Sequence, residues 1–354
     1  MPRRPPPSPQ SQPGVVDPEI WRLCAGTTVE IPTLHSRVYY FPQGHFEQAS
    51  SVPRTRSLSP RLLSKPAIPC RVVSLQFLAD PVTDEVFAKM ILHPIADGFA
   101  AGPSSVVAPA PTQNDENKDV VPFSKVLTVS DANNGGGFSV PKDCADFIFP
   151  LLNFKNDPPV QNLLVTDVHG FVWEFRHIYR GSPRRHLLTT GWSTFVNNKK
   201  LIAGDSVVFM KNSRRELFVG IRRPTRFSPG KDVGGGMRIK VDEEEEEEEE
   251  VREAFSRDGR GKLSAKVVAE AAELAACNMP FEAVYYPKAG WSEFVVKTET
   301  VHEAISVKWR PGMKVKIATE TDDSSGVSWC QGTVSSVSSQ GNGQWRCSTW
   351  RMLQ

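Results

Sequence analysis

The densest group of side chains suited to binding chemistry lies in the sequence RGSPRRHLLTTGWS, residues 180–193. Its arginines and hydroxyl groups are Arg180, Arg184, Arg185, Thr190 and Ser193. A guanidinium group offers paired N–H donors to a phosphate or to the O6 and N7 atoms of guanine, and hydroxyl groups suit phosphate oxygens. Pro183 stiffens the turn and lowers the entropy cost of placing the arginines. The pattern predicts a polyanion-binding loop, and the alternative is a solvated basic turn.

A second candidate is the glycine-rich sequence SDANNGGGFSVP, residues 130–141, in which Gly135 and Gly136 precede Phe138 and Ser139. Glycine allows close approach of the backbone to a ligand. A nucleotide-phosphate loop would continue with Lys-Ser/Thr or carry a G-x-G-x-x-G pattern, and neither is present. The chain also lacks a G-x-S-x-G elbow and an H-E-x-x-H motif. The sequence therefore predicts a binding protein that is not an enzyme.

The charge is distributed unevenly along the chain, which has a formal net charge of +2. Residues 123–227 contain 15 Lys and Arg against 8 Asp and Glu, a net of +7. A basic block in a nearly neutral chain is typical of a nucleic-acid-binding module. His177 and His186 lie inside this block, and we expect both to be hydrogen-bonded structural residues.

The cysteines and the N-terminal residues limit the protein class. The six cysteines are not spaced as a metal site, so we expect no metal or cofactor and reduced thiols. No apolar run is long enough to span a membrane. Residues 1–16 are rich in proline and lack the apolar region of a signal peptide, so they are predicted to form a disordered tail.

The elements that must position these loops are mostly strands. Residues 119–227 show strand patterns at 123–130, 163–180 and 205–223, the last two being hairpins. Two short helices are predicted within 139–152 and 191–201, the first with Cys144, Phe147 and Ile148 on its apolar face. In the first hairpin, Phe171, Trp173, Phe175 and Tyr179 share a core-facing side. Many strands with two short helices predict a closed or half-closed β barrel.

The flanking regions show a second set of elements. Asp17 and Pro18 open a predicted helix that ends near Gly26. Predicted strands follow at 28–31, 37–41, 70–79, 85–92, 282–287, 292–298 and 305–309, and a helix is predicted at 263–276. Residues 47–66 and 97–118 are expected to be loop and linker, and 311–354 to be short, turned strands. The acidic run 242–250 is predicted to be a solvated insert, the alternative being an internal mimic of DNA.

The helix at 263–276 carries a small-residue apolar face that includes Val267, Ala271, Leu274 and Ala275. Small residues let two helices approach closely, so this face could join two copies of the chain. The alternative is that it packs on its own strands, and the residues alone leave both readings open.

Several segments of the sequence resemble a known family. FSKVLTVSDANNGGGFSVP, VTDVHGFVWEFRHIYRGSPRRHLLTTGWSTFVNNKKLIAGDSVVF and LFVGIRR resemble the plant B3 DNA-binding domain. DPEIWRLCAG and PFEAVYYP narrow the resemblance to the auxin response factors. The resemblance covers nearly the whole chain after the tail.

The resemblance implies a mainly β fold with short helices, of the α+β class. A seven-stranded B3 pseudo-barrel is inserted in a split dimerisation domain, and a truncated Tudor-like ancillary module follows. The implied parts are the tail 1–16, the first part of the dimerisation domain with its linker at 17–118, the B3 domain at 119–227, the second part with the acidic insert at 228–310, and the ancillary module at 311–354.

The resemblance also implies a nuclear transcription factor that reads TGTC-type auxin response elements in double-stranded DNA as a homodimer. Two arms would contact DNA, one through Gly135, Gly136, Phe138 and Ser139, the other through Arg180, Pro183, Arg184, Arg185, Thr190 and Ser193. Dimerisation would use Val267, Ala271, Leu274 and Ala275.

Two departures from the family pattern bear on function. Gly135 replaces the family's usual histidine, as in its repressor-type branch, and Lys266 replaces a small glycine in the dimer helix.

Corepressors or other family members are expected to bind through regions outside this sequence. The alternative function is a chromatin or protein-interaction module built on Trp329, Trp345 and Trp350.

Overall fold

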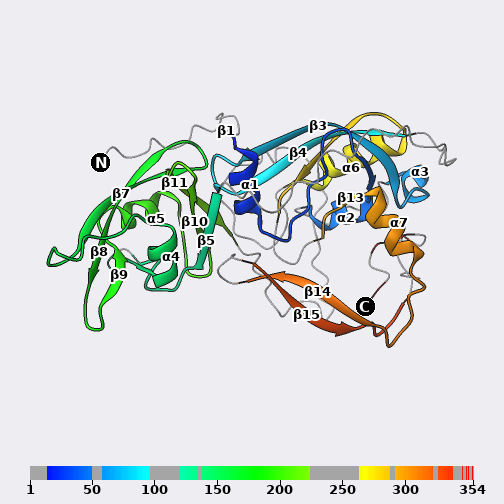
Figure 1. Ribbon diagram of the computed structural model, residues 1–354. Helices are drawn as coiled ribbons and strands as arrows, with labels where there is room; N and C mark the ends of the chain where they lie inside the picture. The colour runs from blue at the N-terminus through cyan, green and yellow to red at the C-terminus, as the bar shows by residue number, and fades with distance from the viewer. Residues whose placement is uncertain are drawn as a thin grey trace, which may run out of the picture.

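The computed structural model describes residues 14–49, 58–95, 120–133, 137–223, 263–287, 292–321 and 326–337, together with Gly135, Trp345, Ser348, Trp350 and Leu353. Two β bodies lie side by side, with helix α1 between them, and a two-stranded hairpin lies below the right-hand body (Figure 1). This architecture confirms the predicted mainly β fold. Gly136, the linker 97–118 and the acidic run 242–250 lie outside the described residues. None of the described helices is long and apolar enough to cross a membrane.

The first body, which we call the barrel, is a curled seven-stranded sheet formed by residues 120–223. Its strand order is β5 (Val120–Val126), β10 (Ser206–Asn212), β11 (Leu217–Arg222), β7 (Val160–Asp167), β8 (Val172–Arg180), β9 (Arg185–Leu188) and β6 (Phe138–Val140). Among the described strands of this sheet, β11 and β7 pair in parallel and the other neighbours are antiparallel. Helices α4 (Lys142–Phe147) and α5 (Trp192–Asn198) are short, as predicted. Trp173 and Phe175 are 3% and 0% exposed, and Phe171 packs against the cluster that contains them, so this part of the hairpin's aromatic face forms the core as predicted. Tyr179 is half-buried and lies outside that cluster.

The second body, which we call the platform, is a six-stranded sheet with its helices, formed by described residues between 14 and 95 and between 263 and 309. Its order is β12 (Phe281–Tyr285), β4 (Val86–Pro94), β3 (Ile68–Ala79), β2 (Arg37–Tyr40) and β13 (Val295–Lys297), with β1 (Gly14–Val15) pairing β3. Its helices are α1 (Pro18–Ala25), α2 (Pro42–Glu47), α3 (Pro60–Leu63), α6 (Ala265–Ala276) and α7 (Thr298–Ser306). Strands from both sides of the barrel sequence thus form one sheet, so the barrel is an insertion within the platform.

Helix α1 joins the two bodies. The Asp17 side chain accepts hydrogen bonds from the backbone N–H groups of Glu19 and Ile20, at 2.9 and 3.2 Å, which caps the helix as predicted. Trp21 is completely buried, and its Nε1 donates to the Phe87 carbonyl at 3.0 Å. The surrounding apolar cluster contains Val16, Ile20, Trp21, Cys24, Ala79, Val86 and Ala88 from the platform and Val120, Val168, Val208 and Met210 from the barrel. The two bodies therefore share one apolar contact.

The third part is the hairpin of β14 (Lys314–Glu320) and β15 (Val327–Thr333), which matches the short strands expected there. Arg222, at the end of the last barrel strand, anchors this hairpin. Its Nη1 lies 2.7 Å from Glu320 Oε2, while its other nitrogens donate to the carbonyls of Leu23 and Cys24 at the end of α1. One guanidinium group thus ties together the barrel, the platform and the hairpin.

Several local predictions were wrong. Residues 28–31 form no strand, and part of the predicted strand 305–309 belongs to α7, where Val301 turns inward and is 8% exposed. The region 47–66 contains the end of α2 and the helix α3. Phe147 is 62% exposed at the end of the six-residue helix α4, whereas Cys144, Ala145 and Ile148 reach the core. Short apolar runs do not distinguish a strand from one helical turn.

Candidate nucleic-acid interface

Two loops of the barrel flank strands β6 and β9, which lie at one edge of its sheet. Arm 1, which we define as residues 127–137, connects β5 to β6, and arm 2, residues 181–184, connects β8 to β9. Strand β6 pairs with β9, with Phe138 opposite Leu188 and Val140 opposite His186. This antiparallel register places Phe138 and Ser139, which follow arm 1, beside Leu188 and Leu187, while arm 2 lies at the opposite end of β9. The two segments that the sequence singled out separately are thus joined through one strand pair.

Asp131 organises arm 1. Its Oδ1 accepts from the Ser139 N–H at 3.0 Å, and its Oδ2 accepts from the Thr128 N–H at 3.0 Å and from Lys125 Nζ at 2.8 Å. Asp131 is 1% exposed. Burial alone would raise the pKa of this carboxyl, but the hydrogen bonds from Lys125, Thr128 and Ser139 outweigh it and hold the pKa below its usual value. An ionised carboxylate therefore fixes the base of the loop.

Arm 1 is also attached to its neighbours. Lys125 Nζ donates to the Ser139 carbonyl at 2.5 Å and lies 4.5 Å from the centre of the Phe138 ring. Trp192 Nε1, in the first turn of α5, donates to the Asp131 carbonyl at 2.7 Å. Sequence reasoning missed Lys125 and Asp131; the Thr-x-x-Asp pattern at 128–131, which favours a turn closed by its own side chains, was the available signal.

The glycines of arm 1 differ in what they need. Gly137 has φ +70°, and a Cβ there would lie 2.7 Å from the Leu188 carbonyl oxygen, so glycine is required. Around Gly135 no atom lies within 4 Å of the position of a Cβ, and its φ is not in the left-handed region. The backbone at Gly135 therefore leaves room for a side chain on the exposed side of the arm.

Arm 2 presents unpaired cations. Arg180 and Arg185 lie directly opposite each other at the ends of β8 and β9, and Arg184 follows Pro183 in the exposed turn. All three arginines are exposed, and no carboxylate in the described part of the chain lies within ion-pairing distance of them. Three clustered, uncompensated guanidinium groups create a positive potential that an anion would relieve.

A chain of hydrogen bonds supports arm 2 from below. Gln161 Nε2 donates to the Pro150 carbonyl at 2.6 Å and lies 3.1 Å from His177 Nδ1, so that ring atom accepts. His177 Nε2 then donates to His186 Nδ1, at 3.0 Å. Burial lowers the pKa of His177 to about 4, with a smaller effect from His186, and burial also lowers the pKa of His186. Both histidines are therefore neutral structural residues, as expected.

The remaining residues of the second predicted group surround the start of α5. Thr190 is exposed, and its carbonyl accepts from the Arg176 N–H at 3.0 Å. Gly191 has φ +92°, and a Cβ there would lie 2.0 Å from the Glu174 carbonyl oxygen, so only glycine lets α5 begin so close to β8. Ser193 follows at this end of the helix and is half-buried.

The predicted dimer residues lie on two sides of α6. Ala271 and Ala275 are buried, at 6% and 0% exposure, in the platform core. Val267 and Leu274 are 49% and 43% exposed and lie seven residues apart on the outer face, with Glu270 between them. The outer face of α6 is thus the part available to a second molecule.

The tail tryptophans do not form one exposed group. Trp345 packs against Phe46 and Trp350 against Phe41, with ring centres 6.0 and 5.2 Å apart, whereas Trp329 lies on β15 and is 63% exposed. Trp345 and Trp350 therefore act as core residues of the platform. Among the described residues, no three His, Cys, Asp or Glu side chains come together as metal ligands.

Comparison with known proteins supports this description. The family described as B3 DNA binding domain matches residues 123–225, and the auxin response factor ancillary domain matches residues 294–354. The chain is 53% identical over 347 residues to auxin response factor 17 of Arabidopsis thaliana, covering 96% of this chain and 58% of the relative. It is 47% identical over 362 residues to auxin response factor 22 of Oryza sativa subsp. japonica, covering 96% and 51%.

Among solved structures, the chain is similar to the Arabidopsis FUS3-DNA complex, with 26% identity and a TM-score of 0.25, over 28% of this chain and 95% of that one. The chain spans about half the length of the curated relatives it matches.

Proposed function

Because this chain belongs to the auxin response factor family over the region that it spans, we propose that it is a nuclear, sequence-specific, double-stranded DNA-binding transcription factor and not an enzyme. The observation that carries the proposal is that both arms flank the paired strands β6 and β9 of the barrel. Arm 2 contains Arg184 and lies between Arg180 and Arg185, and all three arginines are exposed. A loop that hydrogen bonds hold in place and that presents free guanidinium groups suits recognition of a phosphate backbone and of base edges.

Within this function, the arms divide the work by chemistry. Arg184 and Arg185 reach guanine O6 and N7 in the major groove of a TGTC-type element, while Arg180, Thr190 and Ser193 contact phosphates. In arm 1, the backbone of Gly135 and Gly136 approaches the DNA, and Phe138 and Ser139 hold the arm in place. The hydrogen bonds that hold the ends of both arms in place support this assignment, because a preorganised loop loses little entropy on binding.

The protein binds as a homodimer through the outer face of α6, so that two barrels read an inverted pair of elements. Exposed Val267 and Leu274 support this arrangement. Lys266 is exposed beside them, and two like charges near a two-fold axis weaken the dimer. DNA with two sites then strengthens the dimer by raising the effective concentration of the second barrel.

The regulatory direction is repression in auxin-activated signalling. The support is the A-N-N-G-G-G sequence of arm 1, which resembles the repressor-type branch of the family. Corepressors and other family members bind through regions outside this sequence. A chromatin-reading function finds less support, since Trp345 and Trp350 pack in the platform core and no ring among the described residues stacks on Trp329 to form an aromatic cage.

A gel shift tests the proposal. The chain is titrated into a duplex with an inverted TGTC repeat and into a scrambled duplex of the same composition. We expect at least about a thousandfold tighter binding to the repeat, the lower end of the range for specific DNA-binding proteins. Equal affinity for the two duplexes would contradict sequence-specific binding.

A further inference from the structure

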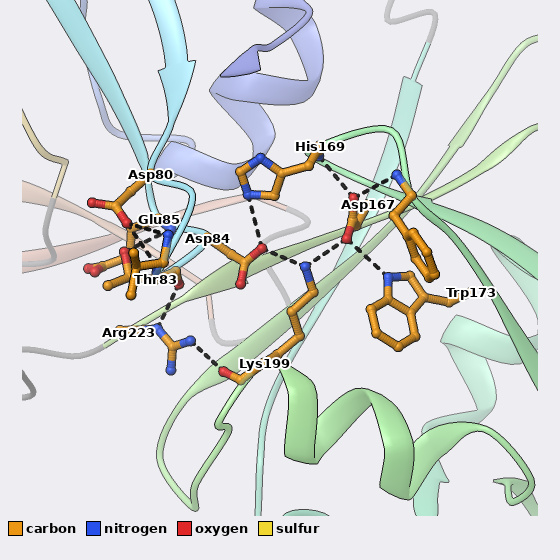
Figure 2. Close-up of polar contacts among 11 residues, drawn as sticks. Asp80, Thr83, Asp84, Glu85, Asp167, His169, Trp173, Lys199 and Arg223 are labelled. Carbon is orange, nitrogen blue, oxygen red and sulfur yellow. Dashed lines mark hydrogen bonds and ion pairs between the residues drawn. The ribbon is translucent and has the colours of Figure 1, made fainter. Parts of the chain in front are cut away.

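A buried cluster of charges lies where the platform meets the barrel, away from the arms (Figure 2). Lys199, directly after α5, places its Nζ 2.5 Å from Asp84 Oδ1 and 2.6 Å from Asp167 Oδ2. The side chains of Lys199 and Asp84 are 1% and 5% exposed. Asp84 lies in the tip of the β3–β4 hairpin of the platform, whereas Asp167 ends barrel strand β7. The ammonium group therefore bridges the two bodies.

Other barrel residues hold the same hairpin tip. Figure 2 shows His169, Lys199 and Arg223 directed toward residues 80–85. His169 Nε2 lies 3.0 Å from Asp84 Oδ1, so the imidazole ring also contacts this carboxylate. Arg223 Nε donates to the Thr83 carbonyl at 2.9 Å, and another of its nitrogens donates to the Lys199 carbonyl at 2.7 Å. The tip is thus fixed in both position and direction.

The charge state of the cluster follows from these contacts. Burial alone would raise the pKa of Asp84, but His169 and Lys199 lower it to about 2. Asp84 also has φ +59°, a left-handed conformation that a non-glycine residue adopts at a cost unless its surroundings hold it. An ionised carboxylate on a constrained turn makes a directional contact.

Helix α5 connects this cluster to the DNA-facing edge. Its first residue, Trp192, donates to the Asp131 carbonyl of arm 1, and Lys199 follows its last residue. Seven residues of α-helix span about 10 Å. One short rigid element therefore links an arm at one end with the platform at the other.

The apolar contact around Trp21 also joins the two bodies, but it restrains them differently. Apolar burial is non-directional and tolerates sliding or tilting of one surface on the other. Charge-assisted hydrogen bonds have strict lengths and angles. A fully buried ion pair adds little to stability compared with apolar residues of the same size, so its contribution here is geometric.

We propose that Lys199 is a positioning residue that fixes the direction of the reading arms relative to the platform, and that it thereby determines which spacing between two half-sites the protein prefers. This inference rests on the proposed function, in which two platforms form the dimer and each barrel reads one half-site. A small tilt at the Lys199 cluster moves both arms, because α5 transmits it to arm 1 and the β6–β9 pairing transmits it to arm 2.

The first experiment compares binding to single sites and to paired sites separated by a series of spacers. Lys199→Met removes the bridging charge and keeps most of the volume. Asp84→Asn is a milder change that leaves the Lys199–Asp167 pair intact, and so guards against loss of folding. Lys200→Met is the matched control, because it removes the same charge from an exposed neighbour.

We expect single-site affinity to stay within about twofold in all three variants, because none alters an arm. The unmutated chain and Lys200→Met should prefer the best spacer over the worst by about tenfold or more. Lys199→Met, and Asp84→Asn to a lesser degree, should reduce this preference to about threefold or less. An unchanged spacer profile in a folded Lys199→Met chain would overturn the proposal.

A second measurement does not depend on DNA. Dyes are attached at Lys155→Cys on the barrel and Arg71→Cys on the platform, in a chain with Cys277, Cys330 and Cys347 changed to Ser. Single-molecule energy transfer at picomolar concentration keeps the chain monomeric. We expect a narrow distribution of transfer efficiency in the chain that keeps Lys199 and in the Lys200→Met variant. The Lys199→Met variant should show a broadened or shifted distribution.

The two measurements separate two kinds of failure. Identical transfer distributions in all chains would contradict the positioning role, whatever the DNA results. Loss of specific TGTC binding by the unmutated chain would instead refute the proposed function, while the transfer distributions would still decide whether Lys199 fixes the barrel on the platform.

Discussion

Gly135 shows at the scale of one residue how the interface can gain a contact. Its surroundings are open and its backbone does not need glycine. We predict that Gly135→His strengthens specific DNA binding by about three- to tenfold, because one added hydrogen bond contributes about 0.5–1.5 kcal/mol. Fluorescence anisotropy on a single-site duplex measures the change.

Gly137→His is the matched control for this prediction. The same side chain there would meet the Leu188 carbonyl in a left-handed backbone conformation, so binding should weaken. If Gly135→His also weakened binding, the open space at that position would not face the DNA.

At the scale of elements, arm 1 depends on one buried carboxylate. Asp131→Asn removes the negative charge that neutralises Lys125 and replaces one acceptor oxygen by a donor. We predict that the free energy of unfolding falls by about 1–3 kcal/mol and that specific DNA affinity falls about tenfold. Urea denaturation and anisotropy measure the two effects.

The exposed acid Asp143 of α4 provides the control, since Asp143→Asn should change neither quantity appreciably. A normal DNA affinity in Asp131→Asn would show that arm 1 keeps its shape without the Asp131 carboxylate.

Sequence patterns predicted the barrel elements well, because alternation in residues 163–180 and the short helices within 139–152 and 191–201 are local properties. They also singled out the two loops that form the proposed arms from residue types. They did not reveal Lys125, Asp131 or Lys199, because each of these residues acts through partners that only the tertiary structure brings close. Lys125 contacts Ser139, and Asp131 contacts Trp192. Lys199 contacts Asp84, which is 115 residues away in the sequence. The placement of Ala271 inside the core likewise depends on how α6 lies on the platform.

At the scale of the whole molecule, two buried histidines make stability depend on pH. Burial lowers the pKa of His45 to about 3 and, with a small effect of His186, that of His177 to about 4, from 6.5. Below pH 6.5 the unfolded chain binds protons that the folded chain does not. The free energy of unfolding should therefore fall by about 1–2 kcal/mol per histidine between pH 6.5 and 5.

Urea denaturation at several pH values tests this prediction. His177→Gln should remove about half of the decrease, because one of the two histidines no longer titrates. Asp84 contributes only below about pH 4, since its pKa is lowered to about 2, so it does not interfere. A free energy of unfolding that is constant from pH 6.5 to 5 would contradict the burial of neutral histidines.

Dimerisation is also a property of the whole molecule. We predict that Leu274→Arg, on the outer face of α6, abolishes cooperative binding to paired sites and leaves single-site binding nearly unchanged. Sedimentation and gel shifts on single and paired sites measure this. Met279→Arg, exposed just beyond α6, is the control, and an equal loss in both variants would place the interface elsewhere.

The central claim is that the arginines of arm 2 read base edges, and base substitution tests it most directly. Replacing the guanines of a single TGTC element by 7-deazaguanine removes the N7 acceptor and little else. A bidentate guanine contact contributes about 1–3 kcal/mol, so the account predicts that 7-deazaguanine lowers the DNA affinity of the unmutated chain about tenfold. The control variant Arg214→Ala should lose affinity to the same extent. The variant Arg185→Ala should lose less than about twofold, because it no longer makes this contact. An undiminished effect in Arg185→Ala, or none in the unmutated chain, would contradict it.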